Sequence, residues 1–472
     1  MRPFEIVIPI LLAGYLIWTP TLPPAIRFLP IIAFAITLIH FEVEGYRWQM
    51  IPLYALTLIL AIISQIGVKG SRETESADSF LTHRLAQGGA VILLAVSTAL
   101  PILLPVPSVE SPSGPYKVGT TTFELTDSSR REIYSGRDEP RRFQIQVWYP
   151  SYPKPGDPHA PWMDRADIFG HAISKFLKLP GFFLDHLKLV KTPAYVKSPI
   201  AKSNEQYPII LFSHGWKGFA AQNTGQAIEL ASQGYVVVAV QHTYGAIVTV
   251  FDDGTIAPNN PDALPSDVSE DMYDTAARKL ADQWSGDLSF ALSFMIHQNN
   301  DSGSMFYSTL DVNRVGVYGH SMGGGAAIQF CGVDPRCKAL LGMDPFMTPV
   351  SLEVLNNGAS QPSFFMFSQG WYGDRDSRNN QLFDAYYSRG TDNLGVIGIE
   401  GAKHYDFSDL PMLSPIAPQL GLKGPINGQK MVKITDTYLL EFFNATLKEK
   451  DSGLFNHVSG EFPEVKLLRL GR

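Results

Sequence analysis

Residues 319–323 read Gly319-His320-Ser321-Met322-Gly323, a Gly-x-Ser-x-Gly sequence. The apolar run from Asn313 to Tyr318 before it is typical of a buried strand, and the small residues from Gly324 to Phe330 after it favour the start of a helix. A serine held in a sharp turn between a strand and a helix takes a strained backbone conformation, and only glycine tolerates the crowding on either side. The sequence therefore predicts a nucleophile elbow that presents Ser321.

Short apolar runs of the buried, parallel-strand type recur on both sides of this elbow. The expected strands cover residues 142–149, 208–212, 235–240, 313–318, 339–343, 363–367 and 394–399. Apolar residues at helical spacing predict helices over 275–297 and 434–447. This alternation, combined with the elbow, predicts an α/β-hydrolase fold over residues 116–472, with a mostly parallel central sheet and flanking helices.

Apolar residues are concentrated in the first 106 residues, in runs at 4–18, 28–41, 50–68 and 90–106. A membrane span needs about 20 apolar residues, so the last two runs are the stronger candidates. We expect a transmembrane helical anchor of about four helices at 1–106, joined by a proline- and serine-rich linker at 107–115 to the catalytic domain. The alternative is a buried helical domain of a soluble protein.

Charged residues in the short loops bear on orientation, because Lys and Arg favour the cytoplasmic side. With four spans, one side carries Arg27, Lys69, Arg72 and Arg84, and the other carries Arg2, Arg47 and Lys117. This count favours a multi-pass membrane protein whose catalytic domain lies outside the cytoplasm. In such a compartment Cys331 and Cys337 can form a disulfide, but the sequence is equally compatible with two buried thiols.

The overall composition excludes some functions. The net charge is −7 and only 18% of residues are charged, which argues against a nucleic-acid-binding protein. The sequence has no metal-ligand spacing, and we expect neither a metal nor an organic cofactor. The oligomeric state stays open.

A serine nucleophile needs a base to remove its proton and a third group to orient that base. In α/β-hydrolases these residues follow the order Ser, Asp or Glu, then His. Two histidines follow Ser321 in the chain. His404 lies in a loop that leaves an apolar strand, whereas His457 lies in a polar tail, so the pattern favours His404 as the base.

The acid has two candidate positions. Asp344 ends the apolar strand that follows the elbow unit, whereas Asp374 and Asp376 follow the next strand, which is the more usual position in this fold. Residues 371–376 have the composition of an exposed loop. The residues alone therefore favour Asp344 without excluding the other two.

The tetrahedral intermediate of ester hydrolysis needs backbone N–H groups directed at its oxyanion. Met322, directly after the serine, is expected to supply one. The loop Ser213-His214-Gly215-Trp216 follows an apolar strand and contains a His-Gly pair, which predicts the Trp216 amide as the second donor. His214 precedes the serine and is expected to shape this turn.

Several segments in order carry a more specific signal than the elbow alone. They are 114–119 (GPYKVG), 211–215 (LFSHG), 319–324 (GHSMGG), 341–347 (LGMDPFM) and 401–404 (GAKH). From about Pro115 to about Leu410 the chain resembles the platelet-activating factor acetylhydrolases of the plasma and intracellular type II kind, which include the lipoprotein-associated phospholipase.

The resemblance implies Ser321 as nucleophile, Asp344 as acid and His404 as base, with oxyanion amides on Trp216 and Met322. It implies a phospholipid or ether lipid substrate with a short or oxidised sn-2 acyl chain. Trp216 stands where the family usually has a smaller aliphatic residue, and Met322 where it often has phenylalanine. Acyl preference therefore stays open.

The stretch 175–189 mixes aromatic and aliphatic residues with lysines, which suits either an element dipping between lipid headgroups or a cap packed on the core. The resemblance implies contact with a lipid surface. Two other functions stay open: a general carboxylesterase or dienelactone-hydrolase-like enzyme acting on small soluble esters, and a non-catalytic membrane sensor with a hydrolase-like domain.

Overall fold

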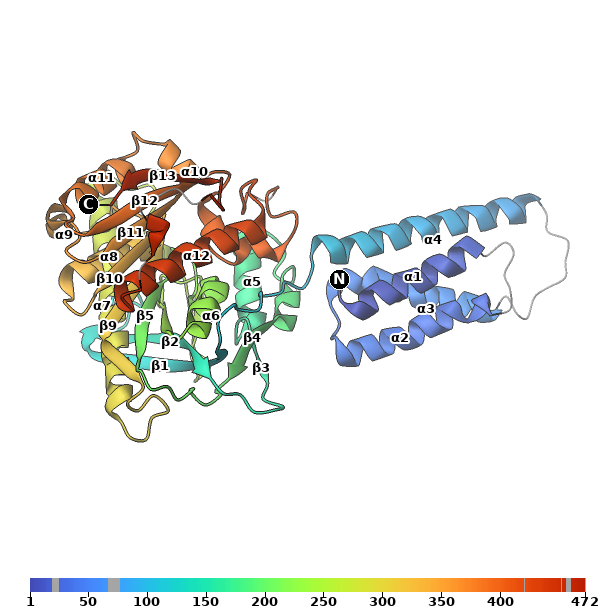
Figure 1. Cartoon of the computed structure of the whole chain (residues 1–472). Coiled ribbons are helices and arrows are strands. Elements are labelled where there is room, and N and C mark those ends of the chain that lie inside the picture. The colour runs from blue at the N-terminus through green and yellow to red at the C-terminus, as the bar shows by residue number, and fades with distance from the viewer. Residues whose placement is uncertain (19–24, 67–76, 420, 451, 456–459, 472) are drawn as a thin grey trace.

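Figure 1 shows a computed structural model of the chain as a helical bundle joined end-on to a larger α/β body. The structure describes residues 1–18, 25–66, 77–419, 421–450, 452–455 and 460–471. His457, Lys69 and Arg72 lie outside the described residues.

An eleven-stranded sheet forms the centre of the α/β body, in the order β13-β12-β11-β10-β9-β5-β6-β2-β1-β4-β3. Its six consecutive parallel strands are β12 (Asn393–Ile399), β11 (Ser363–Ser368), β10 (Ala339–Met343), β9 (Leu310–His320), β5 (Tyr207–Ser213) and β6 (Val236–Gln241). The described strands thus form the large, mostly parallel sheet that the apolar runs predict. Parallel strands are buried on both faces, and β5, β6, β10 and β11 are buried along their whole length.

Antiparallel strands extend the sheet at both edges. On one side lie β2 (Pro140–Ser151), β1 (Lys117–Arg131), β4 (Lys191–Val196) and β3 (His159–Pro161), and on the other β13 (Val465–Leu470). Only the β1–β4 pair on that first side is parallel. The short strands β7 (Val248–Val250) and β8 (Ile256–Pro258) form a separate hairpin.

Helices cover both faces of the sheet, each with its own apolar core. One face carries α7 (Glu270–Asn300), α8 (Met322–Val333), α9 (Leu352–Asn357) and α11 (Arg378–Arg389), and the other α6 (Thr224–Ser232) and α12 (Gly428–Leu447). Successive side chains of a strand point to opposite faces. In β9 Val317 accordingly joins the first core and Tyr318 the second.

The bundle contains α1 (Pro3–Trp18), α2 (Leu29–Val43), α3 (Ile51–Ile66) and α4 (Ala77–Leu103). Each helix packs on the next, and α4 returns to α1. Three stretches, 26–43, 48–65 and 84–103, are long and apolar enough to cross a membrane. The fourth helix, α1, has 16 residues and is shorter than these.

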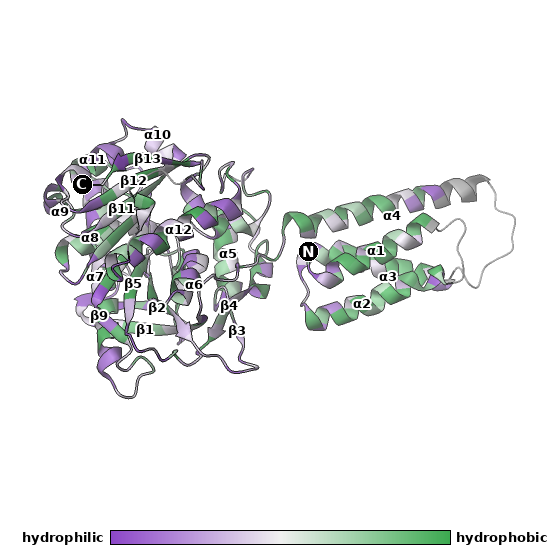
Figure 2. Cartoon of the chain, in the orientation of Figure 1, coloured by the Kyte–Doolittle hydropathy of each residue, from purple (hydrophilic) through white to green (hydrophobic). Residues whose placement is uncertain are grey.

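The helices of the bundle are largely hydrophobic, as the hydropathy colouring in Figure 2 shows, and several of their apolar side chains are exposed. Ile10, Ile17 and Ile92 are 63%, 70% and 67% exposed. A domain buried in the body of a soluble protein would not leave such side chains uncovered. The three long stretches are therefore candidate membrane spans.

The bundle meets the α/β body at the connection between α2 and α3. The Trp48 indole N–H donates to the Phe183 carbonyl oxygen at 3.0 Å, and Gln49 Nε2 donates to His186 Nδ1 at 2.8 Å. Phe183 and His186 belong to the 175–189 stretch, which includes the end of α5 (Ala166–Phe176) and the 3₁₀ helix η4 (Asp185–Leu189). This stretch packs inward through Leu187 and also contacts the bundle.

The linker at 107–115 lies along α6. Ser113 N donates to Glu229 Oε2 at 2.8 Å, and Gly114 N donates to Ser232 Oγ at 3.1 Å. Cys331, in the last turn of α8, forms a disulfide with Cys337, which follows that helix. Hydrogen bonds to α6 therefore fix the linker, and the disulfide fixes the segment that follows α8.

Candidate active site

The elbow forms as the glycines predict. Ser321 lies between β9 and α8 with φ 58° and ψ −121°, a backbone conformation that few non-glycine residues adopt. A Cβ on Gly319 would lie 2.2 Å from the Gly323 carbonyl oxygen, and one on Gly323 would lie 2.1 Å from the Ser213 carbonyl oxygen. Only hydrogen fits at these two positions.

The candidate base and acid are bonded to each other. His404 Nδ1 lies 3.0 Å from Asp344 Oδ2. Asp344 is fully buried, and its carboxylate also accepts from Ser368 N at 2.8 Å and Ser368 Oγ at 2.6 Å. Asp374 and Asp376 are exposed beyond the short helix α10 (Gln369–Gly373). Of the two acid positions, the structure brings Asp344 to His404.

Strand register brings the serine to this pair. His320 on β9 is level with Met343 on β10, so Ser321 and Asp344 are the next residues of neighbouring strands. Ser321 N donates to the Met343 carbonyl oxygen at 3.0 Å. All three candidate residues therefore lie at the carboxyl end of the parallel sheet, where α/β proteins place their sites.

His320, inside the elbow motif, supports the loop of His404. Its Nε2 donates to the His404 carbonyl oxygen at 2.9 Å, and its Nδ1 accepts from Gln222 Nε2 at 3.2 Å. Burial, and to a lesser extent the neighbouring His404, hold the pKa of His320 well below its usual value. His320 is therefore neutral, with its single proton on Nε2.

Trp371 on α10 stacks on the His404 ring, with centroids 5.0 Å apart and planes 6° from parallel. The composition of residues 371–376 predicts an exposed loop, but Trp371 lies on a helix and is half-buried. Sequence reasoning missed both Trp371 and Ser368. Their position at and just after the carboxyl end of β11 was the available signal.

The expected oxyanion loop lies against the serine. A Cβ on Gly215 would lie 3.3 Å from Ser321 Cβ. The Gly215 carbonyl oxygen accepts from His214 Nδ1 at 2.7 Å and from Gly218 N at 2.8 Å. The side chains of Trp216 and Met322 pack in one apolar cluster, so the two expected amide donors come from adjoining segments.

One group among the described residues has side chains close enough to hold a metal ion: Glu5, His40 and Glu44, at the end of the bundle near the α/β body. Arg47 pairs with both oxygens of Glu5 at 2.7 Å, and Arg2 bonds Glu5 as well. The acidic charge of Glu5 is thus already balanced by guanidinium groups, which argues against a cation there.

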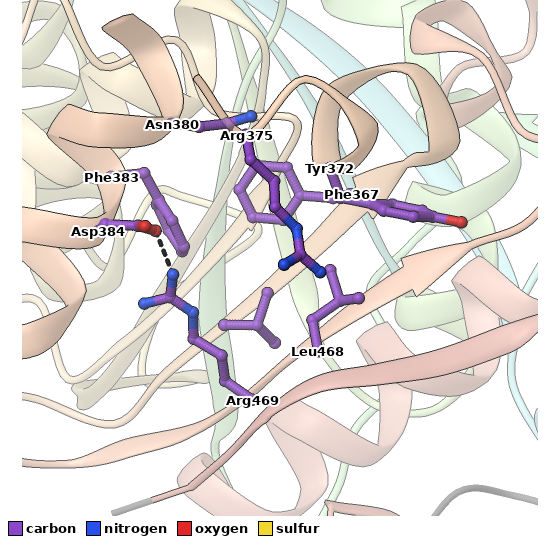
Figure 3. Close-up of a pocket in the computed structure, with 9 residues that line it drawn as sticks. Phe367, Tyr372, Arg375, Asn380, Phe383, Asp384, Leu468 and Arg469 are labelled. Atoms are coloured by element: carbon purple, nitrogen blue, oxygen red, sulfur yellow. Dashed lines mark hydrogen bonds and ion pairs between the residues drawn. The ribbon is translucent and has the colours of Figure 1, made fainter. Parts of the chain in front are cut away.

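A pocket of about 250 Å³ lies on the other side of α10. Figure 3 shows Arg375 reaching into it, and Arg469 paired with Asp384 at its edge. Its aromatic walls are Phe367, Tyr372 and Phe383. Ser321, Asp344 and His404 do not line it, so it is a neighbour of the candidate site.

An elbow serine beside a bonded His–Asp pair at the carboxyl edge of a mostly parallel sheet defines a protein of the α/β-hydrolase class. Comparison with known families agrees: a family model described as "Platelet-activating factor acetylhydrolase, isoform II" matches residues 106–460. The chain belongs to this family and is a carboxylic ester hydrolase. The match begins where the bundle ends.

Individual relatives agree with the family. A platelet-activating factor acetylhydrolase from Cavia porcellus is 29% identical over 357 residues, 71% of this chain and 77% of the relative. A probable 1-alkyl-2-acetylglycerophosphocholine esterase from Arthroderma benhamiae is 24% identical over 413 residues, 80% of this chain and 97% of the relative. A ferulic acid esterase from Streptomyces cinnamoneus shares the fold, with a TM-score of 0.63 at 23% identity over 77% of this chain and 99% of its own.

Proposed function

We propose that this protein hydrolyses short or oxidised sn-2 acyl groups of phospholipids such as platelet-activating factor, through an acyl-enzyme on Ser321. The observation that carries the proposal is the 3.0 Å bond between His404 Nδ1 and Asp344, beside an elbow serine, in a chain of the acetylhydrolase family. Membership of the family supports the substrate class, and this geometry supports the assignment of the residues.

Acylation begins at His404. Because Nδ1–H donates to Asp344, Nε2 keeps a free lone pair that takes the proton of Ser321. Ser321 Oγ attacks the acyl carbonyl carbon, and the carbonyl oxygen becomes an oxyanion that accepts from the amides of Trp216 and Met322. One such donor contributes about 3 kcal/mol to the transition state.

Collapse of this intermediate breaks the bond to the glycerol oxygen, and His404 gives its proton to that oxygen as the lyso-lipid leaves. A water molecule then attacks the acyl-enzyme with His404 again as base, and the carboxylic acid is released. The donors to Asp344 from Ser368 are neutral, so the carboxylate keeps its negative charge to stabilise the imidazolium. These steps use no metal or organic cofactor.

We propose that the bundle anchors the protein in a membrane through about four helices, with the α/β body outside the cytoplasm. Three candidate spans and an apolar outer surface support the anchor. The disulfide between Cys331 and Cys337 supports an oxidising compartment. The 175–189 stretch, at the bundle end of the α/β body, is the proposed contact with lipid headgroups.

The test is hydrolysis of phosphatidylcholines of increasing sn-2 chain length by the full-length protein in vesicles, with a soluble nitrophenyl ester and Ser321→Ala in parallel. We expect turnover confined to short or oxidised chains, and a loss of at least about a thousandfold in the variant. Turnover of the soluble ester alone would indicate a general carboxylesterase. No turnover of either substrate would favour the non-catalytic sensor, and an active Ser321→Ala would overturn the mechanism.

A further inference from the structure

The α/β body contains a second serine–histidine–aspartate group, remote from solvent. Ser213 Oγ lies 2.9 Å from His242 Nε2, and His242 Nδ1 lies 3.0 Å from Asp287 Oδ2. All three residues are fully buried, and Trp284 stacks on the His242 ring at 4.1 Å. No substrate can reach this serine, so the group has another role.

The proton positions in this group follow from Asp287. Its carboxylate accepts from Arg141 at 3.0 and 2.6 Å and from Arg130 at 2.9 Å, and so it is ionised. His242 Nδ1–H therefore donates to Asp287, and His242 Nε2 accepts from the Ser213 hydroxyl. Burial lowers the pKa of His242 to about 4 although Asp287 opposes this shift, so the ring is neutral at working pH.

His242 also determines the state of His214. The His242 backbone N–H donates to His214 Nε2 at 3.2 Å, which leaves the His214 proton on Nδ1. That proton is donated to the Gly215 carbonyl oxygen at 2.7 Å. Burial, with His242 nearby, holds the pKa of His214 well below its usual value, so one neutral tautomer persists.

The Gly215 carbonyl and the Trp216 N–H belong to one peptide unit. In a planar trans peptide these two groups point in opposite directions. The bonds from His214 Nδ1 and Gly218 N therefore fix the direction of the Trp216 N–H as well. Because Gly215 lies against Ser321, this direction is fixed relative to the nucleophile.

We infer that Ser213, His242 and Asp287, acting through His214, form a positioning network that aims the Trp216 amide at the oxyanion. The inference rests on the proposed function, since it gives that amide a task only if Ser321 attacks an ester. These are positioning residues, because none of them touches the reacting atoms.

The test compares Ser213→Ala and His214→Phe with Tyr149→Phe as a matched control. Tyr149 is equally buried, and its hydroxyl donates to the Ser198 carbonyl oxygen at 2.8 Å, away from the loop. Four quantities are measured for each full-length variant: Tm, kcat and KM on a short-chain ester, and the Kd of a trifluoromethyl ketone that forms an oxyanion on Ser321.

We expect kcat to fall about tenfold in Ser213→Ala and about a hundredfold in His214→Phe, with KM within about twofold; removing a whole oxyanion donor costs about a hundred- to a thousandfold. Inhibitor affinity should fall by the same factors. Tyr149→Phe should lower Tm only. If the two loop variants lower Tm but keep wild-type kcat and inhibitor affinity, the network is merely structural and the inference fails. An active Ser321→Ala would instead overturn the proposed function itself.

Discussion

The two serine–histidine–aspartate groups have the same histidine–carboxylate distance, 3.0 Å, yet their surroundings differ. Asp344 accepts its other bonds from the neutral N–H and O–H of Ser368, whereas Asp287 is bonded by Arg141 and Arg130. A carboxylate balanced by guanidinium groups has little charge left to stabilise an imidazolium. The same histidine–aspartate bond therefore belongs to the proposed catalytic base in one group and to the proposed support in the other.

Access separates the two groups as well. Ser321 stands at a strained turn beyond the end of β9, and the side chain of His404 is 26% exposed. Ser213 is the last residue of β5 and is fully buried, and its hydroxyl bonds to His242, on whose ring Trp284 stacks. The two groups thus differ in where the strand ends and in what neutralises the acid, and both differences favour Ser321 over Ser213 as the proposed nucleophile.

The largest expected effect comes from removing the negative charge of Asp344, whose other donors are the neutral groups of Ser368. Asp344→Asn should lower kcat about ten-thousandfold, because the amide favours the wrong His404 tautomer and cannot stabilise the imidazolium. Steady-state hydrolysis of a short-chain ester measures this, and Tm should change little. Asp374→Asn is the matched control and should retain wild-type turnover. Equal losses in both variants would reopen the choice of acid.

Replacing the aspartate of the buried group, Asp287, by asparagine should lower the free energy of unfolding. Asp287→Asn removes one of the two carboxylates that pair with the buried guanidinium of Arg141, the other being Glu132. Breaking a buried ion pair costs about 3–5 kcal/mol in the free energy of unfolding. Urea unfolding followed by tryptophan fluorescence measures this. Asp311→Asn removes a solvent-accessible partner of Arg314 and should cost less than about 1 kcal/mol. An Asp287→Asn protein with the wild-type free energy of unfolding would contradict the contrast drawn between the two groups.

The pH dependence of stability should also identify the buried group. The pKa of folded His242 is about 4, below its ordinary 6.5, so between these values the unfolded chain binds a proton that the folded protein excludes. The free energy of unfolding therefore falls as the pH falls from 6.5 to 4, and His242 accounts for up to about 3 kcal/mol of this loss. His242→Gln removes that contribution, so its urea midpoint should fall less steeply over this range. A slope identical to that of the wild type would show that His242 protonates freely.

The smallest expected effect concerns access of the exposed group to lipid. Trp48→Ala removes the bond to Phe183 and the ring contact with Phe182 at the junction. Without these contacts the α/β body should be less well aligned with the bundle, at a cost of less than about 1 kcal/mol. Turnover of vesicle phospholipid should therefore fall about threefold, and turnover of a soluble ester should not change. Tyr307→Ala, an exposed aromatic residue of the α/β body, serves as the control. Equal effects on both substrates would place the role of Trp48 in stability.

Much of the fold follows from local sequence. The apolar run 339–343 matches β10 residue for residue, because polar residues bound it on both sides. The run 275–297 lies within a longer helix, α7, since Ser269 caps its first turn by accepting from Met272 N. The strand β13 carries charged residues in an antiparallel edge position, and pairing with β12 defines it. Its apolar residues are interrupted by Lys466 and Arg469, so they form neither a strict alternation nor an unbroken run that would predict a strand.

The residues of the candidate site are also only partly predictable from local sequence. Ser321 is predictable from its motif, and His404 from the position of its loop. Ser368 was missed because its contact with Asp344 depends on the pairing of β10 with β11. Trp371 was missed because its contact with His404 depends on the loop after β12 folding back towards the end of β11. His242 and Asp287 are 45 residues apart, on a strand end and a helix. No spacing rule connects them, and only the packed fold does.

The hydrogen bonds between the linker at 107–115 and α6 have a kinetic consequence. Ser113 and Gly114 bond the linker to α6, and Trp48 bonds the bundle to Phe183 of the α/β body. These contacts oppose rotation of the α/β body about the linker. If the bundle is embedded as proposed, the enzyme meets its lipids by lateral diffusion in two dimensions. Its rate would then saturate with the number of substrate molecules per unit area of bilayer. Diluting the vesicles in buffer would leave that rate unchanged, whereas diluting the substrate with inert lipid would lower it.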